Sequence, residues 1–240
     1  MRTIERRQAI IDGETEAQQP ADAGAGTGRP PRMKPGERRE HILQTLAAML
    51  EAPEGEKITT AALATRLGVS EAALYRQFAS KAQMYEALIE FIEATFFGLV
   101  NQIAAKEPNG VLQARAIGLM LLNFSAKNPG MTRVLTGEAL IGEHERLARR
   151  VNQLLERVEA SLKQSLRLAL MEANRTTAGM TGGNAEVEGA AAPLPGDYDP
   201  ALRASLLVSY VLGRWHRYAK SGFTRAPTEH ADAQLRLILQ

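Results

Sequence analysis

Residues 58–81, ITTAALATRLGVSEAALYRQFASK, predict two short helices joined by a tight turn. The hydroxyl groups of Thr59 and Thr60 suit the start of the first helix, where they accept hydrogen bonds from backbone N–H groups. Gly68 is expected to end that helix, because glycine adopts the left-handed conformation that a sharp turn needs. Ser70 then caps the second helix. This order is typical of a helix-turn-helix, whose second helix enters the major groove of DNA.

The apolar residues of this stretch are expected to close the seam between the two helices. The seam consists of Leu63, Leu67, Val69 and Leu74, with Ala64 and Gly68 small where the helices approach each other closely. The other side chains face outward and are candidates for contact with DNA.

Two kinds of contact with DNA are expected from the outward-facing residues. Base edges meet the start of the recognition helix, which consists here of Ser70, Glu71, Ala72 and Ala73. Phosphates bind hydroxyl groups and positive charges, which this region offers at Thr59, Thr60, Tyr75, Arg76 and Lys81. Two alternatives stay open: Tyr75 as a core or ordinary surface tyrosine, and Glu71 as a residue that only stabilises the start of its helix.

The run LYRQFASKAQMYEAL, residues 74–88, resembles the TetR family of DNA-binding regulators. It is similar to the recognition helix of that family, its short phenylalanine turn and the serine and lysine that begin the next helix. The resemblance implies an all-α, TetR-like fold with a three-helix helix-turn-helix DNA-binding domain at residues 34–80. Residues 81–240 are then a helical regulatory and dimerisation domain, and the protein binds double-stranded DNA as a homodimer.

Beyond the DNA-binding domain the resemblance narrows to the nucleoid occlusion branch of that family. It rests on ALIEFIEATF at 87–96, KNPGMTRVLTGEAL at 127–140 and RVNQLLERVEASLKQSLR at 150–167, and it covers most of the chain from about Lys34. It implies a protein that binds specific palindromic chromosomal sites and, while bound, antagonises polymers of the tubulin-like protein FtsZ, so that no division septum assembles over the nucleoid. Charge and periodicity alone do not indicate a role in cell division.

The same resemblance implies contacts with the partner protein. It places the acidic tail of FtsZ in a groove between the first two long body helices, at Phe91, Met120, Lys127 and Asn128. Lys127 stands where the family usually has an arginine, which puts a bidentate contact with a carboxylate in question. Phe91 and Met120 also lie on helical stripes typical of a core, and Lys127 also suits the end of a helix.

Dimer contacts are implied in the same way. Two late helices of each subunit form the dimer interface in the family, which makes Leu206, Tyr210 and Trp215 interface candidates. Core packing within one chain is the alternative for Trp215, since tryptophan is usually highly buried. A dimer carries two recognition helices about one DNA turn apart, so the operator is expected to be two-fold symmetric. Its base sequence cannot be read from these residues.

Helical periodicity also predicts helices elsewhere in the chain. They are expected at about 36–51, 80–103, 111–126, 131–137 and 140–174, and from Asp199 onward. Residues 1–33 are expected to form a disordered leader, and the Thr, Gly, Ala and Pro of about 174–200 a flexible surface loop. Met33 offers a second translation start. The basic residues Arg29, Arg32, Lys34, Arg38 and Arg39 form either an arm that touches DNA or a solvated tail.

Composition excludes several classes of protein. The chain of 240 residues has a net charge of only +2 and no cysteine, which excludes disulfides and thiolate metal sites. No long uncharged apolar run and no signal-peptide core are found, so we expect a cytoplasmic, nucleoid-associated protein. His41, His144, His216 and His230 lack metal-ligand spacing and no nucleophile motif occurs, so no metal, cofactor or enzymatic activity is expected. The remaining alternative is a ligand-responsive transcriptional repressor of the same fold, which needs an apolar cavity between body helices.

Overall fold

The computed structural model describes residues 35–52, 58–180 and 194–240. The expected leader, the start at Met33 and the DNA contacts of Arg29, Arg32 and Lys34 lie outside the described residues. Every regular element of the described residues is helical, which confirms the all-α fold class. Three helices at one end form what we call the head: α2 (Pro35–Leu50), α3 (Thr60–Leu67) and α4 (Glu71–Tyr75).

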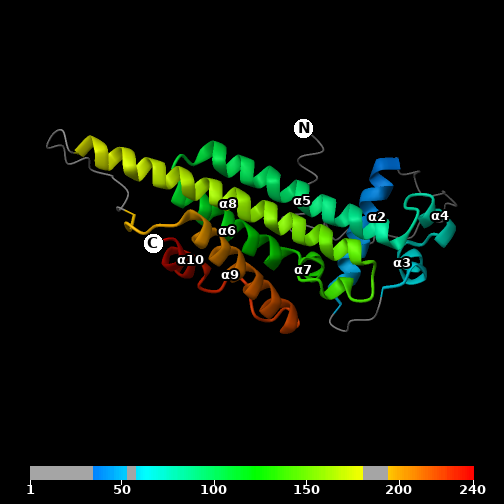
Figure 1. Ribbon diagram of the computed structural model, residues 1–240. Coiled ribbons are helices and arrows are strands. Elements are labelled where there is room, and N and C mark those ends of the chain that lie inside the picture. The colour runs from blue at the N-terminus through cyan, green and yellow to red at the C-terminus, as the bar shows by residue number, and fades with distance from the viewer. Residues whose placement is uncertain (1–34, 53–57, 181–193) are drawn as a thin grey trace, which may run out of the picture.

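The rest of the chain forms an elongated helical body (Figure 1). Its elements are α5 (Lys81–Lys106), α6 (Gly110–Lys127), α7 (Pro129–Leu135), the short 3-10 helix η1 (Glu138–Leu140), α8 (Glu145–Met180), α9 (Pro200–Lys220) and α10 (Ala231–Leu239). The helices α5, α6, α8 and α9 run lengthwise, and α8 contacts the other three, while α10 packs on α6 and α9. α5 begins at the head and continues into the body, so it links the two parts.

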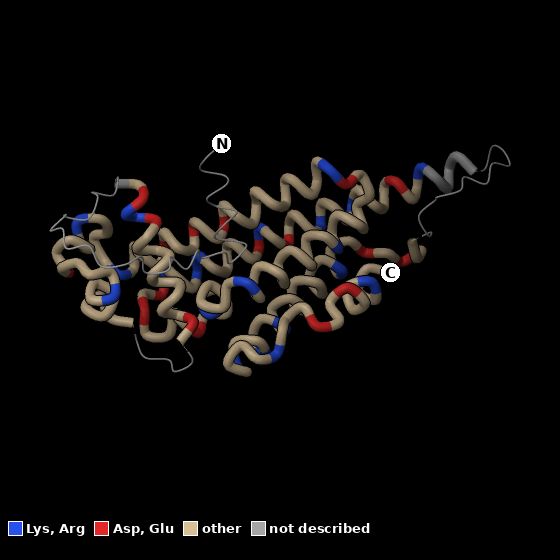
Figure 2. The backbone as a smooth tube through the Cα atoms, turned by 180° about the vertical axis from the view of Figure 1, so that it is seen from behind, with Lys and Arg blue, Asp and Glu red and all other residues tan. Residues whose placement is uncertain are grey.

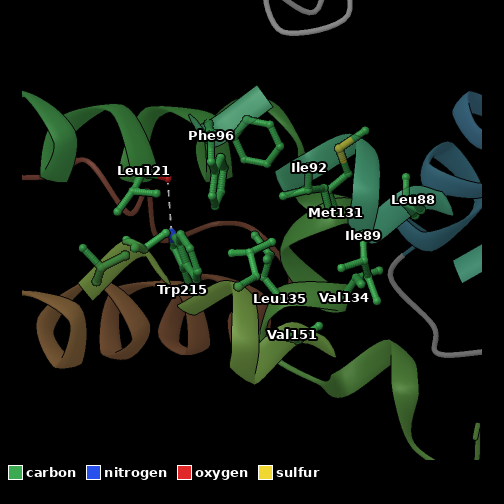
Figure 3. Packing of buried hydrophobic residues seen from close by; sticks show 14 of the residues in the cluster. Leu88, Ile89, Ile92, Phe96, Leu121, Met131, Val134, Leu135, Val151 and Trp215 are labelled. Atoms are coloured by element: carbon green, nitrogen blue, oxygen red, sulfur yellow. Dashed lines mark hydrogen bonds between the residues drawn. The ribbon is translucent and has the colours of Figure 1, made fainter. Parts of the chain in front are cut away.

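Aromatic rings fill the middle of the body (Figure 3). The ring centroids of Phe96 on α5 and Phe124 on α6 lie 4.8 Å apart, edge to face, and Trp215 on α9 lies 6.3 Å from Phe96. The indole Nε1 of Trp215 donates a hydrogen bond to the carbonyl oxygen of Leu121 at 3.3 Å. Trp215 is 0% exposed in a single chain. Of its two expected roles, the structure therefore shows core packing within one chain.

The head is held on the body at a joint between α2 and α7. A Cβ atom on Gly130, the second residue of α7, would collide with the backbone carbonyl of Ala47 in α2, so only glycine permits this approach. The guanidinium of Arg133 donates to the carbonyl oxygens of Leu50 at 3.0 Å and Ala52 at 2.6 Å. Leu50 is the last residue of α2 and Ala52 lies two residues beyond it, so a body residue binds the carbonyls at the end of this helix.

Helix α8 is longer than the sequence predicted. It continues to Met180, so the expected start of the loop near Asn174 is wrong. Asn, Arg and Thr at 174–177 are weaker helix formers than Ala by only about 0.5 kcal/mol per residue, which a long helix tolerates. The loop expected up to residue 200 lies in part outside the described residues, and its last part begins α9 at Pro200.

By length and composition alone, α5 is apolar enough to cross a membrane, which was not expected from the sequence. It is the one such helix among the described residues, and 44% of its apolar window is buried inside the body. The core helix of a globular body meets the same criterion, so this feature carries little weight.

Candidate nucleic-acid interface

Caps at Thr59, Gly68 and Ser70 bound the two helices as predicted, whereas the Thr60 hydroxyl, also expected to cap α3, binds Glu71 instead. The Thr59 hydroxyl accepts a hydrogen bond from the N–H of Ala62 at 3.1 Å, and the Ser70 hydroxyl accepts from the N–H of Ala73 at 3.2 Å. Gly68 has φ 64° and ψ 32°, the left-handed conformation expected for it. A Cβ atom at Gly68 would meet nothing within 4 Å, so the position needs glycine for its dihedral angles and not for close approach.

The seam beneath the two helices differs from the prediction at one residue. Leu63 and Leu74 are almost fully buried, and Leu67 is half-buried. Val69 is 40% exposed, so its expected place in the seam is wrong. The left-handed Gly68 turns the chain so that the next side chain points to solvent. Phe78, which is 1% exposed, packs in the head core instead.

A connected group of polar side chains covers the exposed face of the helix pair. The Thr60 hydroxyl donates to the Glu71 carboxylate at 2.7 Å, and the Tyr75 hydroxyl donates to Thr60 Oγ1 at 3.3 Å. Tyr75 is 43% exposed, so it is not a core residue. These contacts join α3 to α4 and hold the Tyr75 ring on the outer surface. Glu71 thereby has a definite partner in Thr60, in addition to its place in the first turn of α4.

The remaining candidates for contact with DNA differ in accessibility. Ser70, Ala72 and Arg76 are exposed, while Ala73 is half-buried. Lys81 is held within the chain: its ammonium lies 2.5 Å from a carboxylate oxygen of Glu143 and 5.7 Å from the centroid of the Tyr85 ring. Burial and the Glu143 charge raise the pKa of Tyr85 to about 12.

Arg39 is fixed on the head and is not part of a flexible arm. Its Nη1 donates to the carbonyl oxygen of Gln77 at 2.9 Å, and its guanidinium carbon lies 4.0 Å from the centroid of the Phe78 ring. The prediction of a mobile basic arm is therefore wrong at this position. Blue and red segments are both spread over the described parts of the head and the body (Figure 2).

The residues expected to bind the FtsZ tail lie on α5 and α6, which pack against each other. Phe91 and Met120 are half-buried against the body core, and Lys127 is exposed in the last turn of α6. Asn128 is 6% exposed, and its amide donates to the carbonyl oxygen of Phe124 at 2.8 Å. Its amide thus stabilises the corner between α6 and α7, which leaves little of it for a partner.

An apolar face on α9 and α10 lies open in the single chain. Leu206 is 48% exposed, whereas Tyr210 is half-buried and its hydroxyl donates to Gln234 Oε1 at 2.7 Å. Two further leucines of these helices are exposed: Leu202, which the periodicity places on the apolar face of α9, at 64%, and Leu237 on α10, which the sequence did not single out, at 71%. Their helical periodicity was visible in the sequence, but which face the core would cover was not.

Comparison with known proteins identifies the family. Residues 47–88 match the family described as bacterial regulatory proteins, tetR family. Residues 109–179 match the SlmA-like domain described as tetracyclin repressor-like, C-terminal domain. The nucleoid occlusion factor SlmA of Idiomarina loihiensis is 47% identical over 204 residues, which cover 85% of this chain and 94% of that protein. The chain belongs to the SlmA branch of the TetR family. The SlmA of Alteromonas mediterranea is 43% identical over 85% of this chain and 95% of its own.

Solved structures agree with the TetR fold. A TetR regulator from Haloarcula marismortui superposes with a TM-score of 0.66 at 16% identity, covering 85% of this chain and 97% of its own. The regulator FadR of Bacillus subtilis, solved with stearoyl-CoA, gives 0.60 at 11% identity, covering 84% and 97%. At these identities the match concerns the fold alone. As an SlmA-type TetR regulator, the protein is a DNA-binding protein and not an enzyme.

Proposed function

We propose that this protein binds palindromic chromosomal sites as a homodimer. In the DNA-bound state it antagonises FtsZ polymers, so that no septum forms over the nucleoid. It acts in the cytoplasm, at the nucleoid. The observation that carries the proposal is the similarity to nucleoid occlusion factors over 85% of the chain, together with a helix-turn-helix whose outer face is open.

The DNA contacts divide by chemistry. The exposed start of α4 offers Ser70 and Ala72 to base edges, a hydroxyl group and a methyl group that suit hydrogen bonding and thymine contact. Tyr75, Thr60 and Arg76 offer hydroxyl groups and a charge to phosphates, which fix the register without reading sequence. A second copy joined through the open face of α9 and α10 supplies the other half-site.

The FtsZ tail binds, in this proposal, where α5 and α6 meet the corner before α7. Lys127 supplies a positive charge for an acidic segment, and the half-buried Phe91 and Met120 supply an apolar shelf. Charge complementarity at such a contact raises the association rate and the specificity more than the affinity.

Sedimentation of FtsZ polymers tests this function. A duplex enriched by the protein from a random pool is added with the protein to polymerised FtsZ, and a scrambled duplex of equal length is the control. We expect the specific duplex to lower polymer mass or change filament morphology in the presence of the protein. Unchanged polymers with both duplexes would exclude FtsZ as the target.

A matched pair of charge reversals tests the tail site. Lys127→Glu is expected to weaken FtsZ binding and leave the affinity for DNA unchanged, because Lys127 is exposed on the body, away from α4. Lys106→Glu, an equal charge change in the last turn of α5, is the control and is expected to change neither. Equal FtsZ affinity of parent and Lys127→Glu would remove Lys127 from the site.

The packing of the described body residues argues against the alternative of a ligand-responsive repressor. The rings of Phe96, Phe124 and Trp215 occupy the space between α5, α6 and α9. A hollow between α5 and α8 is lined almost wholly by charged residues: Glu86, Glu90, Arg146, Arg149, Arg150 and Gln153. Ion pairs cross or adjoin it, Arg146 with Glu86 at 2.7 Å and Arg150 with Glu93 at 2.5 Å. This lining does not suit an apolar ligand. Release of the operator by a small metabolite, without any effect on FtsZ, would favour the repressor.

A further inference from the structure

A second hollow lies at the carboxyl end of α9, and its lining carries only positive charge. The lining residues are Arg217, Lys220, Ser221, Thr224 and Arg225, which we call the basic hollow. No acidic side chain of the described residues lines it. Arg217, Lys220 and Arg225 are all exposed. Blue segments at this end of α9 are visible in Figure 2.

The loop that carries Arg225 is held against the helix end by hydrogen bonds. The N–H of Arg225 donates to the Ser221 hydroxyl oxygen at 3.0 Å, and that hydroxyl donates to the carbonyl oxygen of Tyr218 at 2.8 Å. Arg214 fixes the far side of the loop through the carbonyl oxygens of Pro227 at 3.0 Å and Glu229 at 2.7 Å. The backbone at Arg225 is therefore fixed beside Arg217 and Lys220.

The helix dipole of α9 favours only some of the positive residues in the basic hollow. Arg217 and Lys220 lie in the last turn of α9, where cations are favourable. Arg225 lies beyond the helix, and its backbone contacts bring a third positive charge next to two others. Like charges so close together repel, so an anion that binds between them gains from all three.

Tyr218 connects the basic hollow to the proposed tail site. The Tyr218 hydroxyl donates to the carbonyl oxygen of Ala126 at 3.2 Å, directly before Lys127. The Tyr218 ring packs edge to face on Phe223, with centroids 5.0 Å apart. Phe223 is half-exposed and has φ 65°, a left-handed conformation that is rare for a residue with a side chain. It precedes Thr224 and Arg225 of the hollow. Tyr218 thus links the end of α6 to the loop of the hollow, and the guanidinium of Arg133 lies 4.8 Å from the centroid of the Phe223 ring.

We propose that the basic hollow is a second anchor for the acidic peptide that the proposed function places at Lys127, so this inference rests on that function. One part of the peptide binds at Lys127, its apolar part crosses Phe223, and its further carboxylates bind Arg217, Lys220 and Arg225. Two linked contacts on one peptide raise its affinity above that of either alone, because the second contact forms within an already bound complex.

A DNA duplex bound to α4 does not suit the basic hollow as a second contact. The recognition helix α4 lies at the outer end of the head, whereas α9 lies along the body and contacts α7 (Figure 1). The basic hollow adjoins the joint between head and body and not the face that carries Tyr75. An acidic peptide is therefore the occupant that the arrangement favours.

Fluorescence anisotropy with a labelled peptide tests the anchor. The probe is a synthetic carboxyl-terminal tail of FtsZ, and the control probe has every Asp and Glu replaced by Asn and Gln. The full-length parent is compared with the double variant Arg217→Glu, Arg225→Glu. The control protein carries the same charge change away from the head, Lys106→Glu with Arg167→Glu, at two exposed positions.

We expect the hollow variant to bind the acidic peptide at least tenfold more weakly than the parent and with a smaller salt dependence. The control variant is expected to bind the acidic peptide with the affinity of the parent. The neutral probe is expected to have the same affinity for all the proteins. The hollow variant is expected to bind the specific duplex with the affinity of the parent. The variant Arg217→Lys with Arg225→Lys keeps the positive charges and is expected to bind the peptide like the parent. Thermal unfolding confirms that each variant folds.

Three results would overturn the anchor. Equal peptide affinity of parent and hollow variant would do so while leaving the proposed function intact. Loss of duplex affinity in the hollow variant would identify the hollow as a DNA contact. A parent that neither binds the peptide nor affects FtsZ polymers would remove the proposed function, and the anchor with it.

Discussion

The ammonium of Lys81 lies 2.5 Å from Glu143 Oε1, although the two residues are 62 positions apart. Their side chains are only 21% and 12% exposed. Lys81 begins α5 directly after the head, and Glu143 lies in the loop before α8. The positive charge expected to contact a phosphate is thus already paired with a body carboxylate, so DNA and Glu143 compete for it.

Replacing Glu143 with glutamine is expected to strengthen DNA binding, because Lys81 then has no carboxylate partner. One additional phosphate contact raises the salt dependence by about 0.9 in the slope of log K against log salt. Duplex titrations at several salt concentrations measure both quantities. Lys81→Ala serves as the control and is expected to lower the slope or leave it unchanged. Identical affinities and slopes for parent and Glu143→Gln would show that Glu143 does not compete with DNA for Lys81.

Tyr75→Phe removes one hydroxyl group from the outer face and leaves the ring. We expect it to weaken binding of specific and random duplexes alike by about 1 kcal/mol, roughly fivefold, as for one lost hydrogen bond. Tyr198→Phe removes a tyrosine hydroxyl from the body, away from the helix pair, and serves as the control in the same titration. A loss confined to the specific duplex would instead make Tyr75 a reader of bases.

Leu206→Asp tests the open face of α9. Because Leu206 is 48% exposed in the single chain, the change costs little monomer stability, but it places a charge in an apolar contact between subunits. Sedimentation equilibrium is expected to show monomers and the duplex titration a large loss of affinity. Ile141→Asp, at a residue 78% exposed in the loop before α8, is the control. A dimeric Leu206→Asp protein would place the interface elsewhere.

Gly130→Ala and Gly98→Ala are expected to have opposite effects on stability. A methyl group at Gly130 collides with the Ala47 carbonyl, so we expect a loss of about 3 kcal/mol. At Gly98, on α5, a Cβ atom meets nothing within 4 Å, and alanine is favoured in a helix by about 1 kcal/mol. Urea unfolding measures both. An unchanged midpoint for Gly130→Ala would mean that the joint adapts.

Tyr85 is expected to make stability fall in alkaline solution. Its pKa rises from 10.0 to about 12 on folding, because burial and Glu143 disfavour the phenolate. Between these values the unfolded chain releases a proton that the folded chain retains, so the free energy of unfolding decreases as pH rises. Below pH 10 this contribution is constant. Urea unfolding of parent and Tyr85→Phe from pH 9 to 11 measures the difference, which is absent if Tyr85 titrates normally.

Local features of the fold were predictable from the sequence, because they depend on neighbouring residues. Thr59, Gly68, Ser70 and Ser80 occupy the expected cap positions. Asp199 caps α9, whose first residue is Pro200, as expected. A cap needs only a side chain and a backbone group within the next few positions, and the sequence shows both.

Long-range partners were not predictable, since no local pattern encodes them. The Arg133 contacts span 81 and 83 positions, and Arg115 pairs with Asp232 across 117. Arg115 and Arg133 looked in the sequence like ordinary charges on helices. The two roles left open for Trp215 have the same origin, because helical periodicity shows that a face is apolar but not what covers it.

The Arg133 contacts have a consequence for exchanging parts between relatives. The last carbonyls of α2 are capped from the body, so residues 35–80 do not contain everything that their first helix needs. A chimaera that joins this DNA reader to a foreign scaffold would have to import an arginine at the equivalent place, with a glycine one turn earlier. The unit that can be exchanged between relatives is thus larger than residues 35–80 and includes the α7 residues that hold the end of α2.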